Sequence, residues 1–416
     1  MTLTNPTTIP ADLLDLDARD PLAHKKAEFL LPPDVIYLDG NSLGPLHCSV
    51  PERLAHVAGR EWGQHLIRSW TGGEEGGQDW MHLPDRVAVK LARLIGAQPT
   101  EVAVGDSTTV NLFKTLAAAL KLAPAGRRVI LTDADNFPTD LYVVQGLNDL
   151  LGGGYELRRV PNTGIAGHLT PDVAVTLFTE VDYRTGRRLD LHGLTAQAHA
   201  AGALTIWDLA HSAGAFPVDL DGAGVDFAVG CGYKFLNGGP GAPAFLYVAA
   251  RHLDLAPVAI SGWMGHADVF EMAREYVPAP GARRFVAGTP QVLGLSALDS
   301  ALDAFADVDM QEVRAKSLSL SSTFMNLMTP LAARHPLELV TPTNQEERGS
   351  QVSYRHPHAR EVMAGLVARG IIGDYRTPDI LRFGITPLYH SHVDIWRAVQ
   401  GIADVLDGRT LEGRQA

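Results

Sequence analysis

Short apolar runs alternate with helical patterns between residues 100 and 230, and this rhythm constrains the fold most. The strand-like runs are EVAVG (101–105), RRVILTD (127–133), VAVTLFTEV (173–181), ALTIWDLA (203–210) and VDFAVG (225–230). Helical patterns such as STTVNLFKTLAAALKL, FPTDLYVVQGLNDLL and LTAQAHAAG stand between them. Alternation of this kind is typical of βαβ units. It predicts a mostly parallel sheet with helices on both faces.

The rhythm changes beyond about residue 305. A long helical stretch leads into the runs LELVTP, SQVSYRH and ILRFGIT, with the helix AREVMAGLVARG between the last two and a helix from VDIWRAVQGIADVLDG at the end. That order favours a small α+β unit on an antiparallel sheet. The sequence therefore predicts an N-terminal segment (1–45), a large α/β domain (46–305) and a small C-terminal α+β domain (306–416).

Composition narrows the classes of partner. The 416 residues carry a net charge of -12, which argues against nucleic acid or an anionic membrane as the main partner. Only two cysteines are present, so a disulfide framework is excluded, and no zinc-ligand spacing appears, HSH at 390–392 included. The first residues are acidic rather than signal-like, and no apolar run approaches the ~18 residues of a membrane span. We expect a cytoplasmic protein without a metal.

Three chemically useful groups follow strands of the predicted sheet. Asp208 ends LTIWD, Lys234 follows VDFAVGCGY, and DSTT (106–109) follows EVAVG. Each has an ordinary interpretation when taken alone: a helix cap for the aspartate and for DSTT, and a surface residue for the lysine. Ligands of open α/β sheets, however, bind at the carboxyl ends of the strands. One βαβ step separates Asp208 from Lys234, so both are predicted to face one crevice.

Together these groups match the needs of pyridoxal phosphate. A lysine carries this cofactor covalently, a carboxylate keeps its pyridine nitrogen protonated, and a helix start binds its phosphate. An aromatic side chain must also cover the ring, and Phe137 is placed for this role. We therefore predict that Lys234 bears pyridoxal phosphate, and that the surrounding glycines allow close approach of the backbone.

Six motifs extend this prediction to a family. They are LDGNSLG (38–44), NFPTD (136–140), WDLAHSAGA (207–215), YKFLNGGPG (233–241), SGWMGH (261–266) and LRFGITPLY (381–389). In this order, from about residue 10 to 410, the chain resembles kynureninase. The Asp–Lys pair is shared with aminotransferases, whereas DGNSLG combined with SGWxGH is far more specific. The resemblance implies the aspartate-aminotransferase type of fold, known as fold type I, and hydrolysis of L-kynurenine to anthranilate and L-alanine.

The resemblance also assigns roles to single residues. It implies catalytic roles for Lys234, Tyr233 and Asp208, and substrate binding by Ser42, Trp70 and Arg382. The cofactor-binding residues that it implies are Thr108, Thr109, Phe137, Pro138, Thr139, Asp140, Thr179, Asp208, His211, Tyr233, Lys234, Trp263 and Thr289.

Some of these roles leave a choice open. Tyr233 binds the phosphate, relays protons, or does both. Arg382 is suited to bind the substrate's α-carboxylate because guanidinium offers a planar pair of donors; the alternative is that it bridges the two domains structurally. Trp70 either contacts the substrate's ring or packs the N-terminal segment.

The resemblance further implies a homodimer in which Trp263 and Thr289 reach the partner's site. In animal relatives the positions matching Trp70 and Thr289 look to be histidine and asparagine, which can bind the hydroxyl of 3-hydroxykynurenine. We therefore expect a preference for L-kynurenine here. Relatives serve tryptophan breakdown and, in some organisms, NAD biosynthesis.

Other reactions on the same cofactor are the nearest rivals. A cysteine desulfurase needs a catalytic cysteine beyond the lysine, and none follows Cys231. An aminotransferase remains conceivable because Lys, Asp and Arg are common to both classes. A cofactor-binding regulator without turnover would need a further DNA-binding or partner-binding module, and the chain offers no spare domain or basic segment for one.

Overall fold

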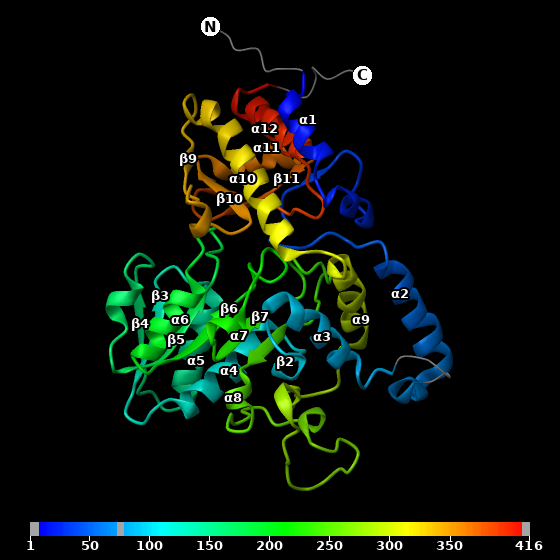
Figure 1. Cartoon of the computed structure of the whole chain (residues 1–416), viewed down its shortest axis with the longest axis vertical. Coiled ribbons are helices and arrows are strands. Elements are labelled where there is room, and N and C mark those ends of the chain that lie inside the picture. Colours follow the sequence, from blue (N-terminus) through cyan, green and yellow to red (C-terminus); the bar gives the residue numbers. More distant parts are fainter. Residues whose placement is uncertain (1–7, 73–78, 410–416) are drawn as a thin grey trace.

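The computed structural model describes residues 8–72 and 79–409, and it contains a large sheet, a small sheet and a short two-stranded pair (Figure 1). Figure 1 shows the large sheet in the lower part of the molecule and the small sheet above it. Within the described ranges, no helix is long and apolar enough to cross a membrane.

The large sheet has seven strands in the order β2-β8-β7-β6-β5-β3-β4. Its strands are β2 (Val102–Val104), β3 (Val129–Asp133), β4 (Glu156–Val160), β5 (Val173–Thr179), β6 (Leu204–Asp208), β7 (Phe227–Gly230) and β8 (Phe245–Val248). The five strands from β7 to β4 are parallel, whereas β8 runs antiparallel to both of its neighbours. The predicted α/β fold with a mostly parallel sheet is confirmed.

Alternating strand residues face two separate apolar layers. In β3, Val129 and Leu131 belong to one buried cluster, whereas Ile130 between them belongs to the other. The first cluster includes residues of α3 (Leu83–Ile95), α6 (Leu191–Ala200) and α9 (Val292–Ala301). The second includes residues of α4 (Thr108–Leu122), α5 (Pro138–Leu150) and α8 (Ala250–Leu253). Because side chains alternate across a strand, one continuous apolar run covers both faces.

The small sheet is antiparallel, in the order β12-β13-β10-β9. Its strands are β9 (Glu338–Leu339), β10 (Gln351–Arg355), β12 (Asp374–Arg376) and β13 (Ile380–Gly384). Helices α10 (Met310–Ala332), α11 (Ala359–Val367) and α12 (His392–Leu406) share one buried cluster with it. The predicted antiparallel arrangement of this part of the chain is confirmed.

The N-terminal segment packs against this C-terminal part. Helix α1 (Ala11–Ala18) lies beside α12, and Asp17 accepts a hydrogen bond from the backbone of His392 at 2.7 Å (Figure 1). Strand β1 (Ile36–Tyr37) pairs in parallel with β11 (Ile371–Ile372). The chain then crosses toward the large sheet and forms α2 (Val50–His56), the π-helical η2 (Val57–His65) and the 3-10 helix η3 (Leu66–Thr71).

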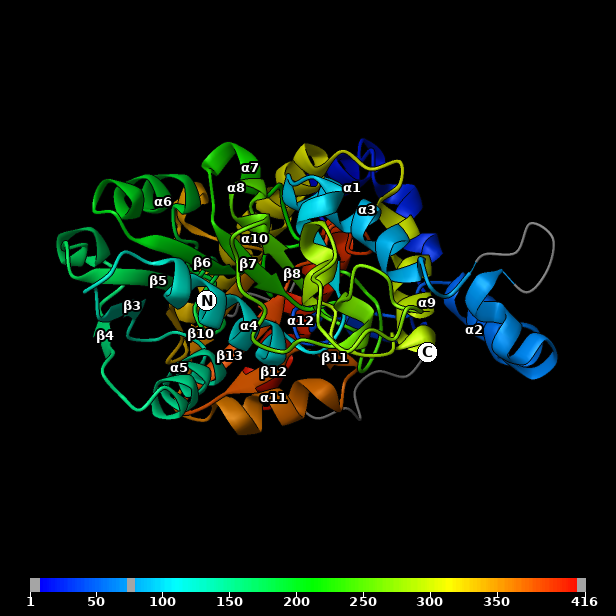
Figure 2. The ribbon, with the colours of Figure 1, turned by 90° about the horizontal axis from the view of Figure 1, so that it is seen from below.

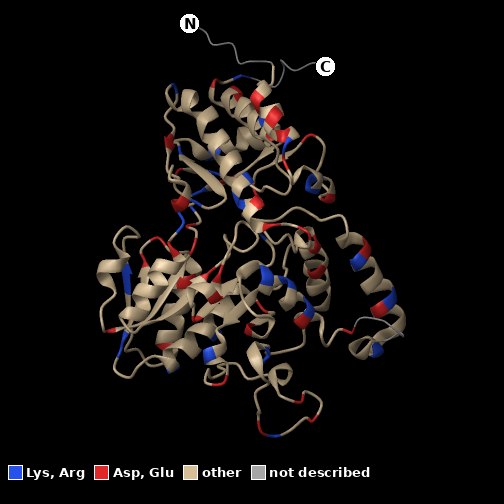
Figure 3. Cartoon of the chain, in the orientation of Figure 1, with Lys and Arg blue, Asp and Glu red and all other residues tan. Residues whose placement is uncertain are grey.

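This helical arm, made of α2, η2 and η3, packs against α9 through Val50 and otherwise projects from the molecule. Figures 1 and 2 show α2 and its continuation projecting to one side of the large sheet. Figure 3 shows basic and acidic residues interspersed along it. Its apolar side chains Trp62, Leu66 and Ile67 are exposed, Ile67 to 75%. An exposed apolar group of this kind marks a surface that another protein chain can cover.

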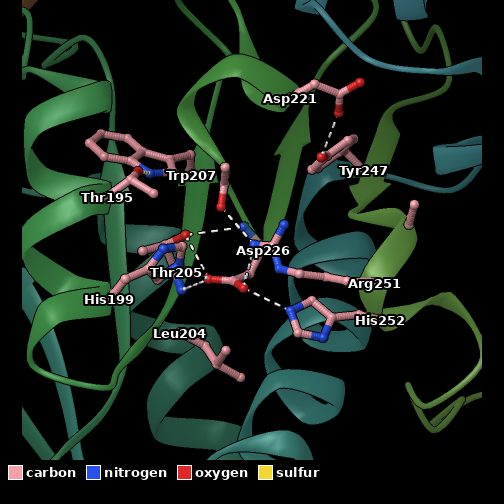
Figure 4. A network of polar contacts seen from close by, with 12 residues as sticks. Thr195, His199, Leu204, Thr205, Trp207, Asp221, Asp226, Tyr247, Arg251 and His252 are labelled. Atoms are coloured by element: carbon pink, nitrogen blue, oxygen red, sulfur yellow. Dashed lines mark hydrogen bonds and ion pairs between the residues drawn. The ribbon is translucent and has the colours of Figure 1, made fainter.

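A buried carboxylate ties the amino ends of β6 and β7 together. Asp226 accepts hydrogen bonds from the backbone of Thr205 at 2.8 Å and from His199 and His252 at 2.7 Å each, and it pairs with Arg251 (Figure 4). Burial alone would raise the pKa of Asp226, but these donors outweigh it and lower the pKa. The opposite, carboxyl ends of the same two strands carry Asp208 and the loop with Lys234.

Candidate active site

Asp208 and Lys234 meet at the carboxyl edge of the large sheet. Asp208 is the last residue of β6 and lies opposite Val229 of the parallel strand β7, and Lys234 follows β7 in a loop. The two residues therefore lie on neighbouring strands, as the sequence predicts. The Lys234 Nζ atom lies 3.1 Å from His211 Nε2. Because burial and the nearby lysine both disfavour a second positive charge, the pKa of His211 is lowered well below its usual value.

Two buried carboxylates face this lysine. One Asp208 oxygen accepts a hydrogen bond from the Ala210 backbone N–H at 2.8 Å. Burial raises the pKa of Asp208, and the charge of Lys234 opposes that rise. Burial, followed by the charge of Asp208, raises the pKa of Asp140 well above its usual value. A buried carboxylate of this kind gains most from a cationic N–H donor.

Asn136 connects the expected ring-covering residue to β5. Its side-chain oxygen accepts hydrogen bonds from the Phe137 backbone at 2.6 Å and from Thr179 Oγ1 at 2.5 Å. The Phe137 ring is 37% exposed, lies 6.0 Å from Lys234 Nζ and packs edge-on against Tyr183. Pro138 begins α5 directly after it and fixes the backbone there, with Thr139 and Asp140 in the first turn.

The expected phosphate donors lie at a helix start. Thr108 and Thr109 open α4, and Ser107 caps it by accepting a hydrogen bond from the Val110 backbone N–H at 3.3 Å. The first N–H groups of a helix are free to bind an anion. Tyr233 lies beside Lys234, whose Nζ is 5.7 Å from the tyrosine ring. The pKa of Tyr233 is raised to about 12, mainly because the side chain is buried. Its hydroxyl is therefore protonated at neutral pH and can donate a proton.

A second cluster surrounds Arg382, which is 1% exposed. Its Nε donates to Asp374 Oδ1 at 2.7 Å and its Nη2 donates to the other oxygen of the same carboxylate. Nη2 also donates to Ser42 Oγ at 2.7 Å, and Nη1 donates to the Tyr183 carbonyl at 2.6 Å. Arg376 adds a hydrogen bond from its Nη2 to Asp374 Oδ2 at 2.6 Å. The structure thus brings Ser42 and Arg382 together. The bond to the Tyr183 carbonyl links Arg382 to the loop that follows β5 of the large sheet.

One short segment connects the two clusters. Ser42 belongs to the Arg382 cluster, and two residues later the Gly44 backbone N–H donates to the Tyr233 carbonyl at 2.8 Å. A Cβ atom on Gly44 would lie 2.3 Å from the carbonyl oxygen of Lys234, closer than any real contact. The glycine is required because backbone meets backbone at this point.

Three predicted residues lie outside both clusters. Trp263 opens η6 (Trp263–Gly265) and is 38% exposed, and Thr289 is exposed just before α9. Trp70 lies in η3 and packs edge-on against Trp80 at 5.5 Å between ring centroids. Within one chain, these residues form no contact with Lys234 or Arg382 among the interactions of the described residues.

Several members of the site have no role in the prediction from sequence. Asn136 belongs to NFPTD and stands just before Phe137, and that position is the one local signal for its contact. Asp374 and Arg376 belong to the short run DYR, which has no strand-like pattern, so their contact with Arg382 was not foreseeable. Among residues 8–72 and 79–409, no group of three or more potential ligands is arranged to hold a metal.

The residues at the strand ends fit pyridoxal phosphate. Asp208 is buried with a carboxylate that a protonated pyridine nitrogen would satisfy, and Lys234 Nζ lies among Phe137, Tyr233 and His211. The His211 Nδ1 atom is buried without a hydrogen-bond partner in the structure. A polar group on a bound ring can supply that partner.

Residues 313–402 match the family model for the kynureninase C-terminal domain. The chain is 70% identical to a kynureninase of Deinococcus radiodurans over 99% of this chain and all of that protein. In fold it is similar to the apo structure of a cysteine desulfurase from Thermococcus onnurineus NA1, with a TM-score of 0.76, 19% identity, and coverage of 97% of this chain and 100% of that chain. It is also similar to a C-DES variant with glycine covalently linked to the PLP cofactor, with a TM-score of 0.75, 17% identity, and coverage of 91% and 99%.

Proposed function

This chain belongs to the kynureninase family and is a pyridoxal-phosphate-dependent hydrolase of L-kynurenine, and from that premise we propose how its residues divide the work. The arrangement of Asp208 and Lys234 on neighbouring strands supports the division best. The products are anthranilate and L-alanine, which places the reaction in the kynurenine pathway of tryptophan breakdown. The aminotransferase alternative is not favoured.

We propose that Lys234 holds the cofactor and then acts as the base. When bound, pyridoxal phosphate acts as an electron sink that stabilises negative charge on the substrate's carbon atoms. Lys234 Nζ, when not bound to the cofactor, would take the proton from the substrate's α-carbon. Asp208 would support this step because its carboxylate would keep a proton on the pyridine nitrogen. His211 stays neutral, as its lowered pKa requires, so it adds no competing positive charge.

The hydrolytic step needs a water at the γ-carbonyl and a proton donor nearby. Tyr233 is our first candidate, since a pKa raised to about 12 keeps its hydroxyl protonated at neutral pH. A phosphate-binding role uses the same hydroxyl, and both roles are compatible with its place beside Lys234. On the other side of the substrate from the γ-carbonyl, Arg382 and Ser42 bind the α-carboxylate.

A direct assay tests the reaction. Purified protein with pyridoxal phosphate and L-kynurenine is expected to release fluorescent anthranilate together with an equal amount of L-alanine. Stoichiometric keto acid in place of alanine would instead identify an aminotransferase.

We propose that the active form is a homodimer whose partner contributes Trp263 and Thr289. Both residues are exposed in the single chain and near further exposed apolar residues of the same segment. The exposed apolar side chains of the helical arm, Trp62, Leu66 and Ile67, support a second contact area. We also propose that the domains begin at residues 46 and 306 and that the protein is cytoplasmic.

Charge placed on the helical arm is expected to break the dimer. In Ile67→Glu the sedimentation coefficient should fall to that of a monomer, and activity should fall with it, because an uncompensated carboxylate would be buried at the interface. Leu150→Glu is the matched control: Leu150 is 72% exposed and is the last residue of α5, a helix that lies away from α2 in Figure 1. Mixing the inactive variants Lys234→Ala and Trp263→Ala should restore part of the activity. A fully active monomer would contradict the shared site.

The substrate's ring is expected to be selected by Trp70 and Thr289. The bulk and apolar face of the Trp70 indole favour an unsubstituted ring, and the hydroxyl of Thr289 is shorter than an asparagine side chain. A hydroxyl buried without a partner costs about 1–3 kcal/mol. The value of kcat/KM for L-kynurenine should therefore exceed that for 3-hydroxykynurenine by about tenfold or more. The double variant Trp70→His, Thr289→Asn should narrow or reverse the preference. Equal values in the wild type would support the other interpretation, in which Trp70 only packs against Trp80.

A further inference from the structure

Arg382 is held by a carboxylate of this chain before any substrate arrives. The antiparallel pairing of β12 with β13 places Asp374 directly opposite Arg382. Directly paired residues of two strands point to the same face and lie within contact distance. The carboxylate of Asp374 then takes the edge of the guanidinium formed by Nε and Nη2.

This pairing leaves the other edge of the guanidinium to two neutral acceptors. Arg382 has five N–H donors in a fixed fork, and the edge formed by Nη1 and Nη2 is the one turned away from Asp374. Nη2 donates to Ser42 Oγ and Nη1 donates to the Tyr183 carbonyl along that edge. The Tyr183 ring packs against Phe137, which lies 6.0 Å from Lys234 Nζ. An anionic carboxylate on the cofactor side of the site is a stronger partner for a guanidinium than either neutral acceptor and can replace them.

Asp374 is itself fixed by its neighbours. It accepts hydrogen bonds from Arg376 Nη2 at 2.6 Å and from the Ser42 hydroxyl at 2.8 Å, in addition to those from Arg382. Two guanidinium groups thus share this carboxylate. A second acidic side chain, Asp39, lies near both arginines, and burial followed by the charge of Asp374 raises its pKa to about 7. Burial by itself would raise the pKa of Asp374, but the bonds to Arg382 outweigh it and lower the pKa. The carboxylate stays ionised at neutral pH and keeps its hold on both arginines.

We propose that Asp374 is a positioning residue that orients Arg382, so that the Nη1–Nη2 edge of the guanidinium receives the substrate's α-carboxylate. This inference rests on the proposed carboxylate-binding role of Arg382. A guanidinium without this support is free to rotate, and misplacement of a positioning group lowers affinity strongly even though the charge is retained. A competing interpretation, in which Asp374 blocks Arg382 and must be displaced, makes the opposite prediction for affinity.

The test compares two ligands on the holoenzyme of each variant. The first is L-kynurenine, measured by its KM and kcat. The second is the amine that remains when the α-carboxylate of kynurenine is removed, measured by its inhibition constant. Asp374→Asn should raise KM by about tenfold or more and change kcat by less than about threefold. The inhibition constant of the decarboxylated amine should stay within about twofold, because this ligand does not use Arg382. Asp374→Glu retains the charge and should recover part of the loss.

Two further variants separate the possible failures. Asp379→Asn is the matched control, since Asp379 lies in the turn of the same hairpin and pairs with the exposed Arg355. It should leave both ligands unaffected. Arg382→Lys should weaken L-kynurenine but not the decarboxylated amine; if it weakens both equally, the carboxylate role of Arg382 fails, and the inference fails with it. If Arg382→Lys discriminates and Asp374→Asn does not, or if Asp374→Asn lowers KM, only the positioning role is overturned.

Discussion

Lys234→Ala is expected to lose essentially all turnover of L-kynurenine. The variant lacks the covalent tether of the cofactor and the base at the α-carbon at once. General-base catalysis alone contributes about 10²–10⁴-fold, so the combined loss should exceed that range. Absorbance shows whether the cofactor is retained, and anthranilate fluorescence measures the residual rate.

Two lysine variants sharpen this result. Lys234→Arg retains the positive charge beside His211 and should be equally inactive, because a guanidinium cannot carry the cofactor. Lys121→Ala removes an exposed lysine at the end of α4 and should behave as the wild type. Borohydride treatment of the wild type should fix the cofactor on the peptide that contains Lys234. Attachment to another lysine would contradict the assignment.

Asp208→Ala is expected to lower kcat by on the order of 10²–10³-fold while the protein stays folded. Removing the side chain loses the hydrogen bond from the Ala210 backbone N–H, but burial disfavours the ionised carboxylate, so we expect a fall in Tm of only a few degrees, far smaller in effect than the loss of rate. The rate falls because the pyridine nitrogen is no longer kept protonated. Asp208→Asn keeps the shape of the side chain and should lose activity to a similar degree.

Asp190→Ala is the control with the reverse pattern. Asp190 caps α6 by accepting a hydrogen bond from the Gly193 backbone N–H at 3.0 Å, and it plays no part in the site. Loss of such a cap costs about 0.5–2 kcal/mol of stability. Its Tm should therefore fall while kcat stays unchanged.

Wild-type turnover in Asp208→Ala would refute the role proposed for the Asp208 carboxylate.

The predictable part of the fold is the part with strong local patterns. Runs of apolar residues mark β3, β5, β6 and β7 because both faces of a central parallel strand are buried. Strand β4 was missed, since its sequence ELRRV is charged and half exposed at the edge of the sheet. The pairing of β1 with β11 joins residues far apart in the chain, and no local pattern announces such a pairing.

The same distinction applies to the site. Asp208 and Lys234 were predictable because each ends a recognisable strand, and parallel neighbours bring such ends together. The partners of Arg382 were not, because they depend on the register between β12 and β13 and on a chain crossing near Ser42. The proposed contributions of Trp263 and Thr289 cannot be derived from strand patterns, because they would require a second copy of the chain.

The segment that joins Ser42 to Gly44 spans two peptide steps, or at most about 7 Å of extended backbone. One end bonds to the cluster around Arg382, and the other bonds to the carbonyl beside Lys234. The segment therefore limits how far the Arg382 cluster and the loop that carries Lys234 can separate, because a chain this short cannot stretch further.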